Sequence, residues 1–275
     1  MLSREEQEIV YQKAYVAEHL VHYVQAMSGA DPCLHDGYLC FLKADHLIFV
    51  GYALEERAVE PEHAYESACR LFQPATVAVI SPKIWFPESD AEHAVHDTCY
   101  RLTLPIGEIK PDLAYMIRRA EREVRIGRGS FGPEHKKLTE AFIAERQITA
   151  GHEEILRRLP EYVVSAPTAR LLEARKDGEL VAFSVLDLGS ASYLFYLFNF
   201  RSTVTYVPGA SDLLFHQMVN MAEDEGKGAV NLGLGISGGV RRFKEKWGAS
   251  PFLPYTALQV RRKPIGLLDM LRRLV

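Results

Sequence analysis

Several features that mark special classes of protein are missing from this 275-residue sequence. No segment approaches the ~20 apolar residues needed to cross a bilayer, and there is no low-complexity run. The opening MLSREEQEIVYQK is too acidic and polar for a secretory signal. These absences exclude membrane-spanning, secreted and disordered classes, and they predict a cytoplasmic globular protein.

Cysteine is also scarce. The four cysteines, Cys33, Cys40, Cys69 and Cys99, all lie in the first half, and none belongs to a C-x-x-C pair. In a cytoplasmic chain such residues are expected to be reduced and to pack as small core side chains.

Metal-ligand spacing is equally absent. His93, His96, Asp97 and Cys99 fall within seven residues, and zinc uses such ligands. They lie in a stretch predicted to be irregular, without a recognised zinc spacing. We therefore expect surface histidines there and no bound metal.

Charge is present in both signs but is spread unevenly. The net charge is −4; residues 1–128 hold 13 Lys and Arg against 20 Asp and Glu, and residues 129–275 hold 19 against 16. The asymmetry points to an anionic ligand on the C-terminal half. It is too mild to indicate nucleic-acid binding, and no DNA partner is expected.

Hydrophobic periodicity predicts a mixture of helices and strands. The first helix begins with a capping box at Ser3 and Glu6 and ends at Gly29. Further helices are expected near 61–72, 111–124, 134–147, 150–158, 212–226 and 238–247. Strands are expected near 38–42, 47–50, 76–80, 99–104, 169–175, 180–187, 192–198, 230–234 and 252–260, the three from 169 to 198 forming an antiparallel meander.

The stretch VNLGLGISGGVRRFKEKWGA, residues 230–249, contains two familiar patterns. The glycines from Gly233 to Gly238 fit G-x-G-x-x-G, but only 37 residues follow and the next strand carries no acid, so a dinucleotide fold is excluded. The G-x-S-x-G around Ser237 fits a nucleophile elbow. That fold needs a later histidine, whereas the last one is His216, so a serine hydrolase is excluded too.

The same glycines also fit a sharp strand-to-helix turn. Ser237 then caps a helix whose Phe243 and Trp247 lie one turn apart and are expected in the core.

The order of elements after residue 134, together with the sequence GGVRRFKEKWGA (238–249), resembles the GNAT acyltransferases and, within them, the Fem-like branch of aminoacyl and acyl transferases. The sequence VPGASDLL (207–214) is similar to theirs as well. The resemblance covers roughly residues 134–255. It implies an α+β fold with a mixed sheet, in which a degenerate GNAT-like domain (1–128) precedes a GNAT-like domain with the active site (129–275).

The resemblance further implies an N-acyltransferase. The donor is an acyl-CoA, with aminoacyl-tRNA as the alternative, and the acceptor is an amine on an amino acid, peptide, cell-wall precursor or lipid headgroup. A catalytically inactive GNAT fold that binds a ligand or partner protein stays open as the second interpretation.

A helix N-terminus with small side chains can bind an anion such as a pyrophosphate. This reasoning and the resemblance together place the donor at the start of the helix near 210, with ordinary helix capping as the alternative. The residues assigned to donor binding are Val207, Pro208, Gly209, Ala210, Ser211 and Arg242.

The chain departs from the usual GNAT pattern at two positions. Tyr206 stands where an Arg or Gln precedes the phosphate loop, and Lys244 stands where a tyrosine acts as general acid. The resemblance assigns Lys244 and Tyr255 as catalytic residues, with Lys244 neutralising a donor phosphate or the leaving group. A solvated surface lysine is the alternative. By the same resemblance, the oxyanion donors are backbone amides near Leu194–Leu197.

The last 15 residues, RRKPIGLLDMLRRLV, combine leucines with basic residues. Such a helix suits weak contact with a membrane surface. Docking on the other domain or on a second copy is the other interpretation, and the oligomeric state is left open.

Overall fold

The computed structural model describes residues 2–87, 91–146 and 148–262. The chain forms two compact units that are discontinuous in sequence. Unit 1 comprises residues 1–6, 30–97 and 254–275, and unit 2 comprises residues 7–29 and 98–253. Strands β5 (Ala91–Thr103) and β11 (Ser250–Arg261) each have residues in both units.

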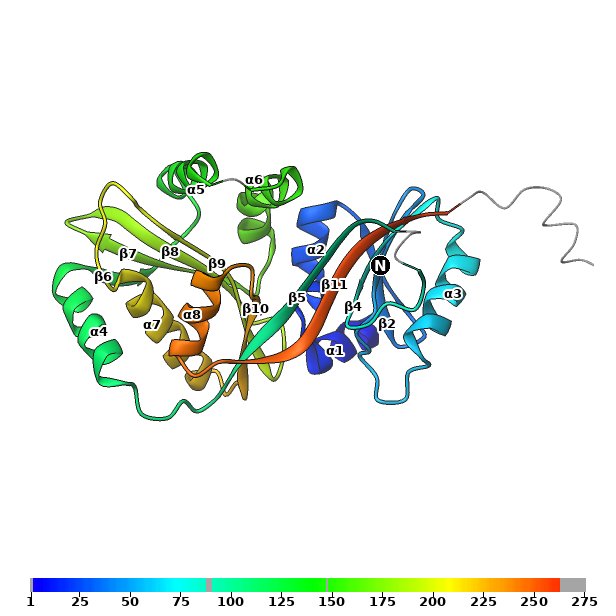
Figure 1. The fold of residues 1–275 in the computed structure, drawn as a ribbon, viewed down its shortest axis with the longest axis horizontal. Helices are drawn as coiled ribbons and strands as arrows, with labels where there is room; N and C mark the ends of the chain where they lie inside the picture. Colours follow the sequence, from blue (N-terminus) through cyan, green and yellow to red (C-terminus); the bar gives the residue numbers. More distant parts are fainter. Residues whose placement is uncertain (1, 88–90, 147, 263–275) are drawn as a thin grey trace, which may run out of the picture. The chain divides into compact units, whose positions relative to one another are not determined.

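Unit 1 is a small mixed sheet with one helix on it. Its strand order is β1-β2-β3-β4-β11, with β3 and β4 parallel and the other pairs antiparallel. Helix α3 connects β3 to β4, and its Ala64 and Ala68 are buried against the sheet (Figure 1). The bounds are β1 (Asp31–His35), β2 (Tyr38–Lys43), β3 (His46–Val50), α3 (Pro61–Phe72) and β4 (Thr76–Ser81).

Unit 2 is built on a larger mixed sheet. Its strand order is β5-β10-β9-β8-β7-β6; β9 and β10 are parallel, and the other neighbours are antiparallel. The bounds are β6 (Arg125–Arg128), β7 (Ala169–Lys176), β8 (Glu179–Asp187), β9 (Tyr193–Arg201) and β10 (Ala229–Leu234).

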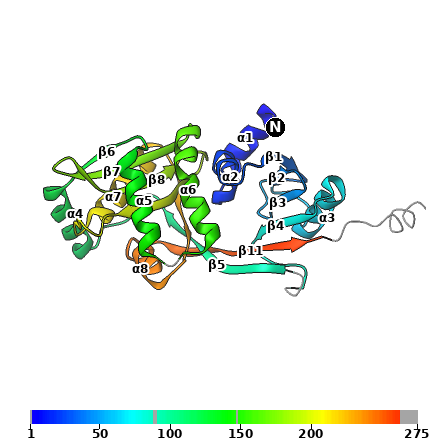
Figure 2. The same ribbon diagram turned by 90° about the horizontal axis from the view of Figure 1, so that it is seen from above.

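Helices cover both faces of the unit 2 sheet. One core contains side chains of α4 and α7, and Trp247 at the end of α8; the other contains side chains of α2, α5 and α6. Figures 1 and 2 both show α5 and α6 (green) side by side. The bounds are α2 (Val21–Ser28), α4 (Pro111–Glu123), α5 (Pro133–Glu145), α6 (Ala150–Ser165), α7 (Ala210–Asp224) and α8 (Gly238–Lys246).

Most predicted elements are confirmed, including the capping box, in which the Ser3 and Glu6 backbone amides donate to each other's side chains. The single first helix is wrong. It is divided into α1 (Arg4–Lys13), a 3-10 turn η1 (Ala17–His19) and α2. The carbonyls of Ala14 and Tyr15 accept hydrogen bonds from Ser190 and Asn231, so tertiary contacts override the helical periodicity there.

The irregular stretch expected before residue 97 is also wrong, because β5 begins at Ala91. In addition, β1 and the short β6 lie where no strand was expected. Residues 263–275, which contain the predicted tail helix, lie outside the described residues.

The compact units cut across the division at residues 128/129. Helix α4 and the second part of β5 precede residue 129 but belong to unit 2, because they pack with α7 and pair with β10. That residues 1–128 and 129–275 are two copies of one fold stays a prediction.

Candidate functional site

The most distinctive feature of unit 2 is the brief pairing of its two parallel strands. β9 and β10 share only three register positions, ending at Phe195 opposite Asn231. Beyond this point, β9 continues to Arg201 beside β8, and β10 continues to Leu234, without a further register match between them. The backbone of β9 therefore has no register partner on β10 over residues 196–201.

A local irregularity follows the last paired residue on each strand. In β10, Gly233 has a left-handed backbone with φ 67°, and its N–H donates to Asn231 Oδ1 at 2.7 Å. The register with β5 shifts over the same residues. In β9, Leu197 is an extra residue, because Tyr196 pairs with Leu186 and Phe198 pairs with Val185. Bulges of this kind bend a strand and re-aim its side chains.

The bulge at Leu197 reverses which face of the sheet the following residues occupy. Tyr196 packs in the core with α7, with its ring 5.3 Å from that of Phe215. Phe198 and Phe200 stack in the opposite core, with α5 and α6. Burial raises the pKa of the Tyr196 phenol, which therefore remains protonated at neutral pH.

The predicted donor loop lies at the start of α7, which follows β9. Gly209 has φ 84°, and a Cβ there would meet the Met116 carbonyl oxygen of α4 at 2.5 Å. Val207 and Ala210 are buried, whereas Pro208 and Ser211 are half-buried. The glycine is thus required by close helix packing and by its backbone conformation, whether or not a phosphate approaches.

A chain of side-chain hydrogen bonds reaches the first turn of α7 from the sheet. The Ser184 hydroxyl donates to Asn199 Oδ1 at 3.0 Å, and Asn199 Nδ2 donates to Ser211 Oγ at 3.2 Å. Because the Ser211 hydroxyl oxygen accepts the hydrogen bond from Asn199, the Ser211 hydroxyl proton can be donated to another acceptor.

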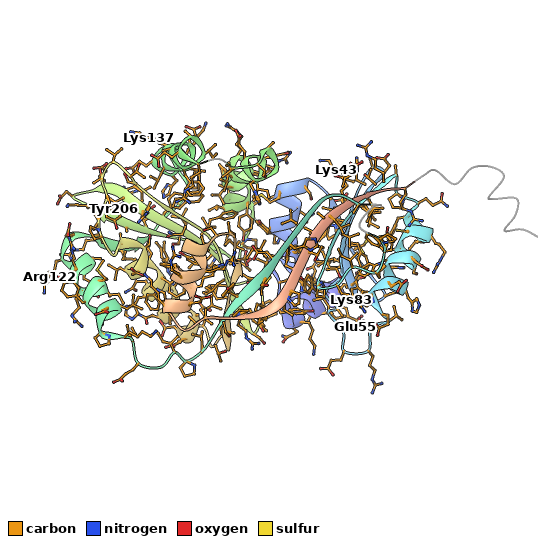
Figure 3. The ribbon with its side chains drawn as sticks, in the orientation of Figure 1. Lys43, Glu55, Lys83, Arg122, Lys137 and Tyr206 are labelled. Carbon is orange, nitrogen blue, oxygen red and sulfur yellow. The ribbon has the colours of Figure 1, made fainter. Side chains whose placement is uncertain are left out.

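Tyr206 belongs to an anchored loop between β9 and α7. The hydroxyls of Thr203 and Thr205, on the same loop, donate to Glu145 and Glu179. Tyr206, labelled in Figure 3, is 53% exposed. The Arg201 guanidinium carbon lies 5.1 Å from its ring centroid. Arg201 therefore supplies a cation beside Tyr206, the position where the expected Arg or Gln is absent. Sequence reasoning missed this residue.

The start of α8 differs in its surroundings. Ser237 is its N-cap and accepts from the Val240 N–H at 3.3 Å, as predicted. Gly238 and Gly239 are exposed. A Cβ at Gly238 would have the Arg242 guanidinium as its nearest neighbour, at 3.5 Å. Arg242 thus lies at the start of α8, whereas the other predicted donor-binding residues lie at the start of α7.

Lys244 is buried at 4% exposure, so a solvated surface lysine is excluded. Its Nζ donates to the Leu234 carbonyl oxygen at the end of β10 and lies 5.6 Å from the centroid of the Tyr100 ring. Phe243 packs at the edge of the core and Trp247 lies within it, as predicted.

Tyr255, the other predicted catalytic residue, is buried on β11 in unit 1.

The N-terminal segment 7–29 contributes to unit 2 beside the paired ends of β9 and β10. Asn231 Nδ2 donates to the Tyr15 carbonyl at 2.7 Å, and the Ala191 N–H donates to the Tyr11 carbonyl at 2.8 Å. Tyr23 of α2 lies 6.3 Å from Phe198, centroid to centroid. The predicted division at residues 128/129 placed segment 7–29 in the other domain, so these contacts were not expected.

Unit 2 also has a cavity of about 190 Å³ between α5 and α6, lined in part by Phe131, Ile143, Leu156 and Pro160.

Within the described ranges, no group of three or more His, Cys, Asp or Glu residues could hold a metal ion. His96 of the predicted histidine cluster lies within hydrogen-bond distance of the Thr256 hydroxyl, at 3.1 Å. No helix in the described part of the chain is long and apolar enough to span a bilayer.

Comparisons by sequence find no matching family model and no matching curated protein. Comparison of structures finds extensive similarity. The C-terminal domain of a protein described as a lysylphosphatidylglycerol synthetase from Agrobacterium fabrum aligns over 98% of this chain and 95% of its own, with 15% identity and a TM-score of 0.63. FemX aligns over 100% and 98%, with 10% identity and a TM-score of 0.63.

A tandem GNAT protein from the clavulanic acid biosynthesis pathway aligns over 82% of this chain and 79% of its own, with 11% identity and a TM-score of 0.50. The protein therefore has a GNAT fold, and it is similar in fold to FemX. This confirms the fold predicted from the sequence. At these identities, the similarity establishes the fold only.

Proposed function

We propose that the protein is an N-acyltransferase that moves an acyl or aminoacyl group from an acyl-CoA or an aminoacyl-tRNA to an amine. The observation that carries the proposal is the divergence of β9 and β10 after three paired residues. It leaves strand backbone without a partner in the middle of a sheet, on strands that lead along the chain into α7 and α8. The names of the structural neighbours, which include FemX and a tandem GNAT protein, agree with acyl transfer.

The reaction joins the amine nitrogen to the acyl carbon and breaks the C–S bond of a thioester or the C–O bond of an ester. The amine loses a proton, and the departing thiolate or alkoxide gains one. Between these events the carbonyl oxygen carries negative charge. Backbone N–H groups of β9 beyond Phe195 are the donors that we assign to this oxygen, since fixed donors stabilise such charge effectively.

The donor's phosphates are assigned to the start of α7. Exposed N–H groups at a helix start attract anions, and Ser211 has a hydroxyl proton to donate there. Arg201 adds a charge that the helix alone lacks. Arg242, at the start of α8, is assigned a weaker role in donor binding.

Lys244 is assigned a charge-stabilising role. Its ammonium is buried at the end of β10, where it donates to the Leu234 carbonyl. A buried positive charge beside the gap favours negative charge developing on the leaving group. A proton-donating role for Tyr255 stays a prediction from the resemblance.

Binding of coenzyme A, acetyl-CoA and aminoacylated tRNA, measured by calorimetry, tests the proposal together with transfer to a panel of amines. Arg201→Ala should weaken donor binding about threefold to tenfold, since loss of one exposed charge near a phosphate costs about 1 kcal/mol. Arg122→Ala, which removes an exposed arginine on α4, is the matched control. Absence of binding by every donor would contradict the proposal.

A binding protein without catalysis is the second candidate. Two contacts favour it, because each gives a motif residue a structural role: the packing of Gly209 against Met116 and the bond from Lys244 to Leu234. Donor binding without transfer to any amine would support it.

A further inference from the structure

The β1–β2 hairpin of unit 1 places two cysteines directly opposite each other. A two-residue turn, Asp36–Gly37, connects the strands and fixes the register. In this register Cys33 pairs with Cys40. Directly opposed residues of an antiparallel pair point to the same face of the sheet, so the two thiols are neighbours.

The side chains confirm this proximity. The Cys33 and Cys40 thiols are close enough for each to shift the pKa of the other, and neither cysteine is in a disulfide. Cys40 is fully buried, whereas Cys33 is half-buried and reachable from solvent. Cys69 of α3 lies close enough to Cys40 to influence its titration, and it is buried.

The backbone geometry suits a covalent bond between them. Opposed antiparallel residues have Cα atoms about 4.5 or 5.5 Å apart, depending on the pair type. Disulfides span Cα distances of about 4.4–6.8 Å. A bond between Cys33 and Cys40 therefore needs only small side-chain adjustments within one hairpin.

We propose that Cys33 and Cys40 form a reversible disulfide when the protein meets a peroxide. The Cys33 thiolate attacks one oxygen of hydrogen peroxide and breaks the O–O bond, which yields a sulfenic acid at Cys33 and a hydroxide. The hydroxide takes up the proton that the Cys33 thiol had released and becomes one water. The Cys40 sulfur then attacks the Cys33 sulfur, and the sulfenic oxygen leaves as a second water with the Cys40 proton. Two thiols and one peroxide thus become one disulfide and two waters.

The environment divides these roles between the two residues. The hydrogen bond from Cys40 lowers the pKa of the Cys33 thiol, which favours the attacking thiolate at the more accessible position. The same hydrogen bond, together with burial, raises the pKa of Cys40 well above its usual value. Cys40 therefore stays protonated until Cys33 has been oxidised, as suits a resolving thiol.

The test uses the full chain, treated with hydrogen peroxide and then alkylated with iodoacetamide in guanidinium chloride, so that the buried Cys40 is accessible. The protein is then digested with trypsin and analysed by mass spectrometry. Cys33 and Cys40 share the tryptic peptide 14–43, bounded by Lys13 and Lys43. We expect this peptide to lose two hydrogens and to escape alkylation, and dithiothreitol applied before alkylation should reverse both changes. In Cys33→Ser, Cys40 should be alkylated fully.

Matched controls are Cys99→Ser, in unit 2, and Cys69→Ser, in which the disulfide should form as in the wild type. Full alkylation of both cysteines after peroxide treatment would overturn the proposal. So would a peptide that links Cys40 to Cys69, or irreversible oxidation of Cys33 without a disulfide. If a variant fails to fold, the mass of the wild-type peptide 14–43 before and after dithiothreitol still tests the proposal.

Discussion

The two helices that follow the diverging strands begin in contrasting ways. The start of α7 is packed: Gly209 has a left-handed backbone, no side chain caps the helix, and α4 crosses within reach of a Cβ. The start of α8 is open: Ser237 caps the helix, and Gly238 and Gly239 are exposed. The glycines at the two helix starts therefore have different structural roles. Gly209 allows close packing against α4, whereas Gly238 and Gly239 lie in a sharp exposed turn.

This contrast matters for experiments on the donor site. A charged substitution at Gly209 would place a carboxylate at the proposed phosphate site. Because the Cβ would meet the Met116 carbonyl oxygen at 2.5 Å, any such variant perturbs the fold whether or not a ligand binds. Variants at Arg201 and Ser211 test binding without this complication.

The largest expected effect is that of Gly209→Ala. A left-handed non-glycine residue and a clash with the α4 backbone should together lower the free energy of unfolding by about 2–4 kcal/mol. Urea unfolding of the full chain measures this. A loss under about 0.5 kcal/mol would mean that α4 does not pack tightly on the start of α7.

Lys244→Met should have the next largest effect. It keeps the apolar stem but leaves the Leu234 carbonyl without the bond from Nζ, which costs about 1–3 kcal/mol. Urea unfolding measures the stability, and a transfer assay should show a loss greater than any change in donor affinity. Unchanged stability and transfer would contradict the role assigned to Lys244.

Ser237→Ala removes the cap at the open helix start and should cost about 1 kcal/mol of stability. Ser237→Gly should cost only a few tenths of a kcal/mol, because glycine is tolerated at an N-cap. Thermal unfolding of both variants tests this order. The reverse order would show that the cap bond contributes nothing.

Gly238→Ala should have the smallest effect, a stability change within about 0.5 kcal/mol, since the nearest atom is the end of a long side chain. Donor affinity, measured by calorimetry, should be unchanged if the phosphates bind at the start of α7. A large loss of affinity with unchanged stability would move the donor to α8.

The sequence predicted the fold well where local signals agree with tertiary packing. The meander from β7 to β9, the positions of α7 and α8, and the core role of Trp247 all follow from periodicity and turn residues. The resemblance near residues 238–249 led to the GNAT fold, which structural comparison confirms.

The sequence could not predict features that depend on long-range contacts. The first helix is interrupted because its carbonyls bond to residues more than 170 positions away, Ser190 and Asn231. The bulge at Leu197 depends on the register with β8, and burial of Lys244 depends on Leu234 and Tyr100. Arg201 escaped notice because only folding brings it against Tyr206.

Hydrogen–deuterium exchange with and without donor tests the central claim most directly. The full chain is labelled alone, with acetyl-CoA, and with aminoacylated tRNA. We predict that one donor slows exchange in residues 196–201 of β9 and 232–237 at the end of β10. Protection confined to other segments, or none with either donor, would contradict the assignment of the donor to the gap between β9 and β10.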